Sequence, residues 1–169
     1  ALAGDLDGYS GVISKVNVNE LSYLPQNLAV PPFLNVSEVV QTGFYGHILS
    51  NKDKQLATAE LLVRCGVDNI SGLRFADASA GEQQRAWLAF ALAQSKDLVI
   101  MDEPLSSVDL ASRKAFYQLL RDMSGNGKTL VIVTHDVDMA MNYSHRIICL
   151  DGGHKVFEGD PSLFQGFQS

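Results

Sequence analysis

The order of apolar patterns in this 169-residue sequence predicts an α/β fold, with helices flanking a parallel sheet. Leu98–Met101 is an uninterrupted apolar run, as in a strand buried on both faces of such a sheet. Another buried strand is predicted at Thr129–Val133, and helical periodicity in Ala115–Met123 separates the two runs. This alternation of strand and helix is typical of a layered α/β domain.

The first part of the chain combines short strands with a helical insert. Strands are predicted at Val12–Val16 and Leu21–Leu24, before a polar loop marked by prolines. Helical periodicity then extends over Val36–Arg64, and a further helix is predicted at Gly81–Gln94. We therefore expect helices between the first strands and the rest of the sheet.

The last part of the chain continues with small elements. Val137–Met141 predicts a short helix, and Arg146–Phe157 predicts a hairpin whose turn is Asp151-Gly152-Gly153, residues that tolerate positive φ. Asp160 followed by Pro161 is expected to cap a final short helix, because a capping side chain and then proline favour a helix start.

The composition favours one domain with an ordinary apolar core. Hydrophobic residues make up 46% of the sequence and charged residues 19%. The net charge of −6 argues against nucleic acid as a main partner, because phosphate backbones attract basic surfaces. The longest apolar stretch, Ala86–Ala93, is far shorter than the roughly 20 residues of a membrane-spanning helix. Cys65 and Cys149 are expected to be buried, without a disulfide.

Two adjacent carboxylates, Asp102 and Glu103, directly follow the first apolar run. In α/β sheets this end of a strand opens onto the ligand crevice. The first carboxylate can hold Mg²⁺ through water, and the second can polarise a water that attacks a γ-phosphate. A solvated Asp-Glu turn explains the pair equally well when the pair is taken alone.

The segment Ala78–Arg85 opens a predicted helix with small residues. The free amides and positive dipole end of a helix suit a phosphate, Ser79 adds a hydroxyl, and Gly81 permits close backbone approach. Taken alone, the segment is more simply a helix cap. The interpretation as a phosphate site depends on its order and spacing relative to other motifs.

Five segments, in order, resemble the motifs of the ATP-binding cassette (ABC) ATPase family. They are the Q-loop Tyr23–Gln26, the signature Ser79–Arg85, the Walker B strand Leu98–Glu103, the D-loop Leu105–Asp109 and the switch-histidine loop Val133–Asp136. The likeness covers nearly the whole chain and implies a partial P-loop NTPase sheet of the RecA type, flanked by helices.

The resemblance also implies how the single ABC ATPase domain, residues 1–169, is divided. The gap of 79 − 26 = 53 positions between Gln26 and Ser79 is similar to the helical subdomain of transporter ATPases. Residual sheet and Q-loop would occupy 1–30, the helical subdomain and signature 31–95, and the remaining core 96–169.

The resemblance implies functional roles for four residues at or just after the ends of predicted strands. Gln26 would sense Mg²⁺ and the attacking water and link the ATPase to the membrane subunits, and Asp102 would serve the metal. Glu103 would be the general base, and His135 would contact the γ-phosphate. A lone His or Gln at such positions is usually structural or solvated, so Gln26 and His135 gain these roles only as part of the set.

ATP is expected to lie between two ATPase subunits. In the resemblance, Ser79 and Gly81 bind the γ-phosphate of ATP held by the opposite subunit, and Asp109 acts across the dimer interface. Asp109 is equally well explained as the cap of the helix that follows it.

Three positions of the signature segment depart from the family pattern. Ala78 replaces the usual Leu, Ala80 replaces a Gly, and Glu82 stands where Gln is commoner. Ala80 and Glu82 belong to the segment expected to bind ATP. A carboxylate facing the nucleotide would weaken binding, so we expect the Glu82 side chain to point away.

A phosphate loop of the form Gly-x-x-x-x-Gly-Lys-Ser/Thr is missing. Gly125–Thr129 imitates its end, but the first required glycine is Asp122, and the segment leads from a helix into a strand, which favours a simple turn. In the family this loop precedes the position matching Ala1. We expect that the natural chain begins earlier, and that these 169 residues alone neither hydrolyse ATP nor bind it tightly.

The family implies ATP and Mg²⁺ as cofactors and a place at the cytoplasmic face of the membrane. Its partners would be a second ATPase subunit, transmembrane permease subunits and, indirectly, a periplasmic or extracellular substrate-binding protein. Gln84–Gln94, Asn35–Val40 and Gly43–Gly46 are similar to importers of iron-siderophore, haem and cobalamin, and the last two segments also to zinc and manganese importers. We expect a metal-chelate or metal-ion importer.

Two other functional classes stay open. A soluble ABC ATPase of DNA repair or chromosome maintenance would carry a long coiled coil or DNA-binding insert where this chain has a short helical one. A non-catalytic cassette, kept for dimerisation or regulation, fits the missing phosphate loop but not the intact Asp102, Glu103 and His135.

Overall fold

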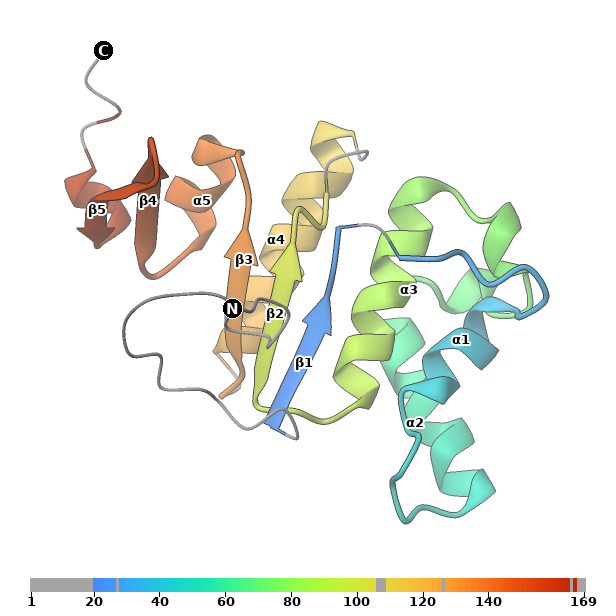
Figure 1. Cartoon of the computed structure of the whole chain (residues 1–169). Coiled ribbons are helices and arrows are strands. Elements are labelled where there is room, and N and C mark those ends of the chain that lie inside the picture. The colour runs from blue at the N-terminus through green and yellow to red at the C-terminus, as the bar shows by residue number, and fades with distance from the viewer. Residues whose placement is uncertain (1–19, 27, 106–108, 126, 165, 167–169) are drawn as a thin grey trace.

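The structure is a computed structural model that describes residues 20–26, 28–105, 109–125, 127–164 and 166 (Figure 1). Its strands and helices, in chain order, are β1 (Leu21–Leu24), α1 (Val36–Thr42), α2 (Asn51–Arg64), α3 (Ala80–Ala93), β2 (Leu98–Asp102), α4 (Leu110–Ser124), β3 (Thr129–Val133), α5 (Val137–Tyr143), β4 (Ile147–Asp151) and β5 (His154–Gly159). Single-turn 3₁₀ helices lie at Asp68–Ile70, Phe75–Asp77 and Pro161–Leu163.

The described sheet consists of three parallel strands in the order β1-β2-β3, and β4 and β5 form a separate antiparallel hairpin. Leu24 pairs with Met101, which pairs with Ile132 on the other side. All three strands point the same way, so their carboxyl ends lie at one edge of the sheet (Figure 1).

Strand β2 forms the centre of the core. Val99 and Met101 are fully buried and Ile100 is nearly so, as predicted for a strand covered on both faces. Helix α4 packs one apolar stripe, with Phe116 and Leu120, into the same cluster. The interior is therefore continuous from the sheet into the helices.

Strand β3 corrects one prediction. It was expected to be buried, but Val131 and Val133 are 39% and 52% exposed, while Leu130 and Ile132 pack against the core. The reason is one-sided cover: α4 contacts β3, and no described element covers the face that carries Val131 and Val133.

The predicted elements are otherwise found close to their expected bounds. Helix α3 begins and ends within one residue of its prediction, and the glycines at 152 and 153 make the hairpin turn with φ of 51° and 80°. The Asp160 side chain accepts a hydrogen bond from the Ser162 N–H and caps the last 3₁₀ helix. The strand predicted at Val12–Val16 lies outside the described residues.

The cysteines differ in their surroundings. Cys65 is buried as expected, and burial raises the pKa of its thiol to about 12. Cys149 is only half-buried, on strand β4, and both thiols are free. Within the described part of the chain, no helix has the length and apolar character needed to cross a bilayer.

Helices α1, α2 and α3 contact one another beside β1 (Figure 1). Gly43 ends α1 directly against α3: a Cβ at this position would lie 2.5 Å from the Phe90 carbonyl oxygen and 2.7 Å from the Ala93 Cβ. The two helices can approach this closely only because position 43 has no side chain.

Replacing this glycine tests the close contact. Gly43→Ala is expected to lower the free energy of unfolding by about 1–3 kcal/mol, because the added methyl must displace backbone. Urea unfolding followed by circular dichroism measures the change. Gly125→Ala is the matched control: it also ends a helix with right-handed φ, and its Cβ would meet nothing closer than 3.5 Å. An equal loss in both variants would contradict the packing argument.

Candidate active site

The carboxyl ends of the three parallel strands bring together the residues predicted for ATP hydrolysis. Gln26 lies two residues beyond Leu24, and Glu103 two residues beyond its pairing partner Met101. His135 lies two residues beyond Val133, whose partner is Asp102. Strand register alone therefore places these four side chains along one edge of the sheet.

Glu103 and His135 are in direct contact. The Glu103 Oε1 accepts a hydrogen bond of 2.9 Å from the His135 backbone N–H, and the His135 Nδ1 lies 2.9 Å from the same oxygen. The Glu103 side chain is 18% exposed and that of His135 is 78% exposed. The Glu103 carboxylate is thus held by the His135 backbone, while the imidazole is exposed to solvent.

The backbone of Glu103 is unusual. Its φ is +46°, in the left-handed region that non-glycine residues rarely adopt. Its N–H donates to the Val133 carbonyl at 2.9 Å, so the ladder between β2 and β3 continues one step past the strand before the chain turns. Such strain is typical of functional sites and costs about 1–3 kcal/mol.

Asp102 and Gln26 offer oxygen atoms suited to a hard cation. Asp102 is half-buried as the last residue of β2, and Gln26 is exposed in the loop after β1. No group of three or more potential metal-ligating His, Cys, Asp or Glu side chains occurs among the described residues. One carboxylate with an amide suits Mg²⁺, which in nucleotide sites keeps several waters and takes its remaining ligands from phosphates.

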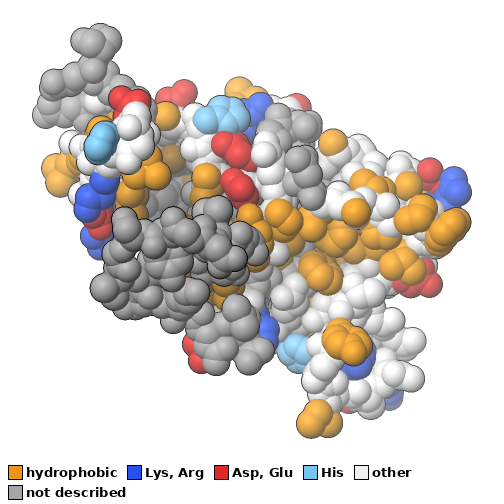
Figure 2. Space-filling model, in the orientation of Figure 1, with side chains coloured by type: hydrophobic (Ala, Val, Ile, Leu, Met, Phe, Trp, Pro, Cys, Tyr) orange, Lys and Arg blue, Asp and Glu red, His pale blue; other side chains and the backbone are white. Residues whose placement is uncertain are grey.

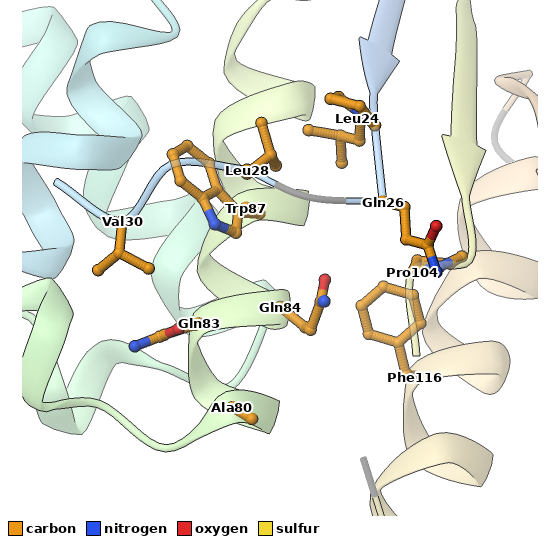
Figure 3. Close-up of a pocket in the computed structure, with 11 residues that line it drawn as sticks. Leu24, Gln26, Leu28, Val30, Ala80, Gln83, Gln84, Trp87, Pro104 and Phe116 are labelled. Carbon is orange, nitrogen blue, oxygen red and sulfur yellow. The ribbon is translucent and has the colours of Figure 1, made fainter. Parts of the chain in front are cut away.

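A pocket of about 210 Å³ separates this edge of the sheet from helix α3. Gln26 and Pro104 line it from the strand ends, and Ala80, Gln84 and Trp87 from α3 (Figure 3). Gln84 points from α3 toward the wall that contains Phe116, whereas Gln83 points away from it and donates to the Phe75 and Ala78 carbonyls (Figure 3). The Q-loop and the start of the signature helix therefore share one concave surface.

The signature segment forms a complete capping box at the start of α3. The Ser79 hydroxyl donates to the Glu82 Oε2 at 2.6 Å, and the Ser79 backbone N–H donates to the same oxygen at 2.8 Å. The Ser79 hydrogen bonds lower the pKa of Glu82 below its usual range. The Glu82 carboxylate therefore turns back onto the cap, and its orientation relative to a bound nucleotide stays a prediction.

The D-loop is described only at its ends. Residues 106–108 lie outside the described part, and Leu105 is buried. The Asp109 side chain accepts a hydrogen bond from the Ser112 N–H at 3.1 Å and caps α4; the bonds with Ser112 lower its pKa. The capping interpretation of Asp109 is therefore correct in this structure, and its role across a dimer stays a prediction.

Lys128, the lysine of the imitation phosphate loop, lies at the opposite end of the strands. Its Nζ donates to the Lys96 carbonyl at 2.7 Å, and Thr129 next to it pairs with Leu98, the first residue of β2. Lys128 therefore lies at the other end of the strands from Glu103 and His135, as predicted.

Two residues of α4 that the sequence did not single out contact the switch-histidine loop and the helix after it. Arg113 forms an ion pair with Asp136, and Tyr117 stacks on Tyr143 of α5. Their spacing of four residues predicts a common helix face. Only the folded chain shows which loop this face meets.

Comparison with known proteins identifies the family. A family model described as "AAA domain, putative AbiEii toxin, Type IV TA system" matches residues 7–139. The ATP-binding cassette MJ0796, solved as a post-hydrolysis dimer bound to ADP and Pi, superposes with a TM-score of 0.74 at 26% identity, covering 89% of this chain and 66% of that one. The chain belongs to the ABC ATPase family. A chain of an ABC transporter in an inward-facing conformation has a TM-score of 0.82, and at 24% identity over 95% of this chain and 65% of its own it shows the fold alone.

Curated relatives of this ABC ATPase include importer subunits with different substrates. Phosphonates import ATP-binding protein PhnC 1 of Pseudomonas aeruginosa is 31% identical over 94% of this chain, and hemin import ATP-binding protein HmuV of Aliivibrio fischeri is 31% identical over 83%. Zinc import ATP-binding protein ZnuC of Cereibacter sphaeroides is 32% identical over 96%. The chain spans 60%, 56% and 65% of these three proteins.

The strained backbone at Glu103 can be measured by substitution. Glu103→Gly should have a free energy of unfolding about 1 kcal/mol higher than Glu103→Ala, as measured by urea unfolding. Both variants lose the carboxylate, and only glycine accepts the positive φ without cost. At Asp102, within the strand, the order should reverse, since glycine weakens a strand by about 0.5–1 kcal/mol relative to alanine. If the alanine variant is the more stable one at position 103 as well as at position 102, φ at Glu103 carries no strain.

Proposed function

We propose that the protein carrying this chain is the ATP-hydrolysing, energy-coupling subunit of an ABC importer. The observation that carries the proposal is the contact between Glu103 and His135 at the strand edge that also holds Gln26 and Asp102. Membership of the ABC ATPase family and the importer subunits among its relatives support it.

Glu103 has the position and the chemistry of a general base. Its carboxylate is fixed by two contacts from His135, one of them from the backbone, and accepts a proton from a water in line with the γ-phosphate. The exposed imidazole of His135 then lies next to the departing phosphate. Mg²⁺, held by Asp102 and Gln26 largely through water, would neutralise charge on the phosphates.

The edge of β3 that does not face β2 suits the strand that leads into a phosphate loop. In the described residues β3 pairs with β2 alone, and the exposed Val131 and Val133 lie on its uncovered face. A strand added at this edge would end beside His135. A phosphate loop following that strand would bring its amides to the γ-phosphate side of Glu103.

The remaining partners follow from the surfaces next to the site. Ser79 to Gly81, at the start of α3, would complete the ATP site of a second subunit, and Asp109 would lie at that interface. The segment between β1 and α1 carries exposed apolar side chains, among them Val30 and Phe33 (Figure 2). Permease subunits would dock there, beside Gln26, holding the ATPase at the cytoplasmic face of the membrane, with a substrate-binding protein acting on the permease.

We infer a metal chelate or metal ion as the transported substrate. The hemin and zinc importer subunits among the relatives support this choice. The phosphonates importer subunit, which is equally similar to this chain, supports phosphonate as the substrate. Uptake of labelled haemin, zinc or phosphonate by the reconstituted transporter decides between them.

The catalytic assignment is tested in the intact subunit. Glu103→Gln should lower the Mg²⁺-dependent ATPase rate by at least about 10²-fold, since the amide cannot accept the proton. Asp97→Asn, an exposed acidic residue before β2, is the control and should leave the rate unchanged. The 169-residue chain itself should show no ATPase activity above background. Activity of this chain that Glu103→Gln abolishes would overturn the need for a separate phosphate loop.

The capping carboxylate at the signature allows a second test. Glu82 occupies the hydroxyl and the N–H of Ser79 that a γ-phosphate would use. Glu82→Gln should therefore raise the apparent affinity of the intact dimer for ATP, by about fivefold for 1 kcal/mol of lost repulsion at a helix start. Glu38→Gln is the matched control, because Asn35 and Glu38 form the same box on α1. Equal effects, or weaker binding in Glu82→Gln, would contradict competition at the cap.

A further inference from the structure

Helix α4 binds the switch-histidine loop directly after His135. Arg113 Nη1 donates to the Asp136 Oδ2 at 3.0 Å, and Asp136 directly follows His135. Both side chains are about two-thirds buried or more, with 32% and 20% exposed. An ion pair this sheltered is screened less by solvent than a surface pair.

Tyr117, one helical turn further along α4, packs against the helix that follows the loop. Its ring stacks on Tyr143 of α5 with 5.7 Å between centroids. Tyr117 is almost fully buried, and this burial raises the pKa of its phenol.

Internal hydrogen bonds tie Asp136 to the residue before His135 and to the start of α5. The Asp136 N–H donates to the Thr134 hydroxyl at 3.1 Å, and the Asp136 Oδ1 accepts from the Met139 N–H at the start of α5. His135 itself is mostly exposed, so packing around the imidazole does not fix it. Its position is set by the backbone on either side and by the contact with Glu103.

We infer that Arg113 is a positioning residue, which holds Asp136 so that His135 stays on the Glu103 carboxylate. This inference rests on the proposed function, in which Glu103 and His135 perform hydrolysis. Arg113 does not reach the reacting atoms. It acts through the loop, because a base displaced by about 1 Å loses up to 10²-fold in rate.

The test uses the intact ATPase subunit with Arg113→Met, Asp136→Asn and the double variant. Asparagine keeps one oxygen for the cap of α5 and replaces the oxygen that Arg113 binds with an NH2 group. Each single variant should lower kcat by about 10- to 100-fold with less than a twofold change in KM for ATP, and the double variant should fall no further. Arg113→Lys should recover part of the rate that Arg113→Met loses.

Arg121→Met is the matched control. Arg121 lies on the same helix and contacts the Asn142 carbonyl of α5, away from the switch loop. If Arg113→Met and Arg121→Met lower kcat equally, or if Arg113→Met leaves kcat unchanged, the positioning role is refuted.

Amide hydrogen exchange provides a readout that needs no turnover. The His135 N–H is bonded to Glu103 and should exchange at least tenfold faster in Arg113→Met and remain unchanged in Arg121→Met. Unchanged exchange at His135 overturns the inference. If Glu103→Gln leaves the ATPase rate of the intact subunit unchanged, the proposed function is refuted instead. The exchange result then still decides whether α4 holds the loop.

Discussion

The hydrogen bond from the Glu103 N–H to the Val133 carbonyl is the constraint on which the site depends. It carries the ladder of β2 and β3 one residue past Asp102, and the chain turns at Glu103 with positive φ. That turn directs the Glu103 carboxylate across the strand end to His135. A strand that ended normally would send the next side chain to a face of the sheet, because side chains alternate along a strand.

Helix α3 relates this edge to the rest of the molecule. Its first turn is tied by Ser79 and Glu82, its middle lines the pocket beside Gln26, and its last turn meets Gly43. One helix thus contacts the signature segment, the Q-loop and the helical subdomain.

The sequence was sufficient for the elements and for the grouping of the site. Apolar runs gave β2 and β3 their bounds, and motif order placed Gln26, Asp102, Glu103 and His135 at strand ends that parallel register then aligned. The exposure of Val131 could not be predicted, because it depends on what covers a face rather than on the strand's own residues. The orientation of Glu82 and the contacts of Arg113 depend on rotamers and on distant loops, which carry no local pattern.

The register of β1 has a consequence for the order of folding. β1 pairs with β2 across 98 − 21 = 77 positions, whereas β2 pairs with β3 across 129 − 98 = 31. Closing the longer loop costs more chain entropy unless the segment between has already condensed. The unit β2-α4-β3 can therefore form early, with Glu103 and His135 in contact, and β1 joins it once α1, α2 and α3 have collapsed. Gln26 is then the last of the strand-end residues to reach its position beside Glu103 and His135.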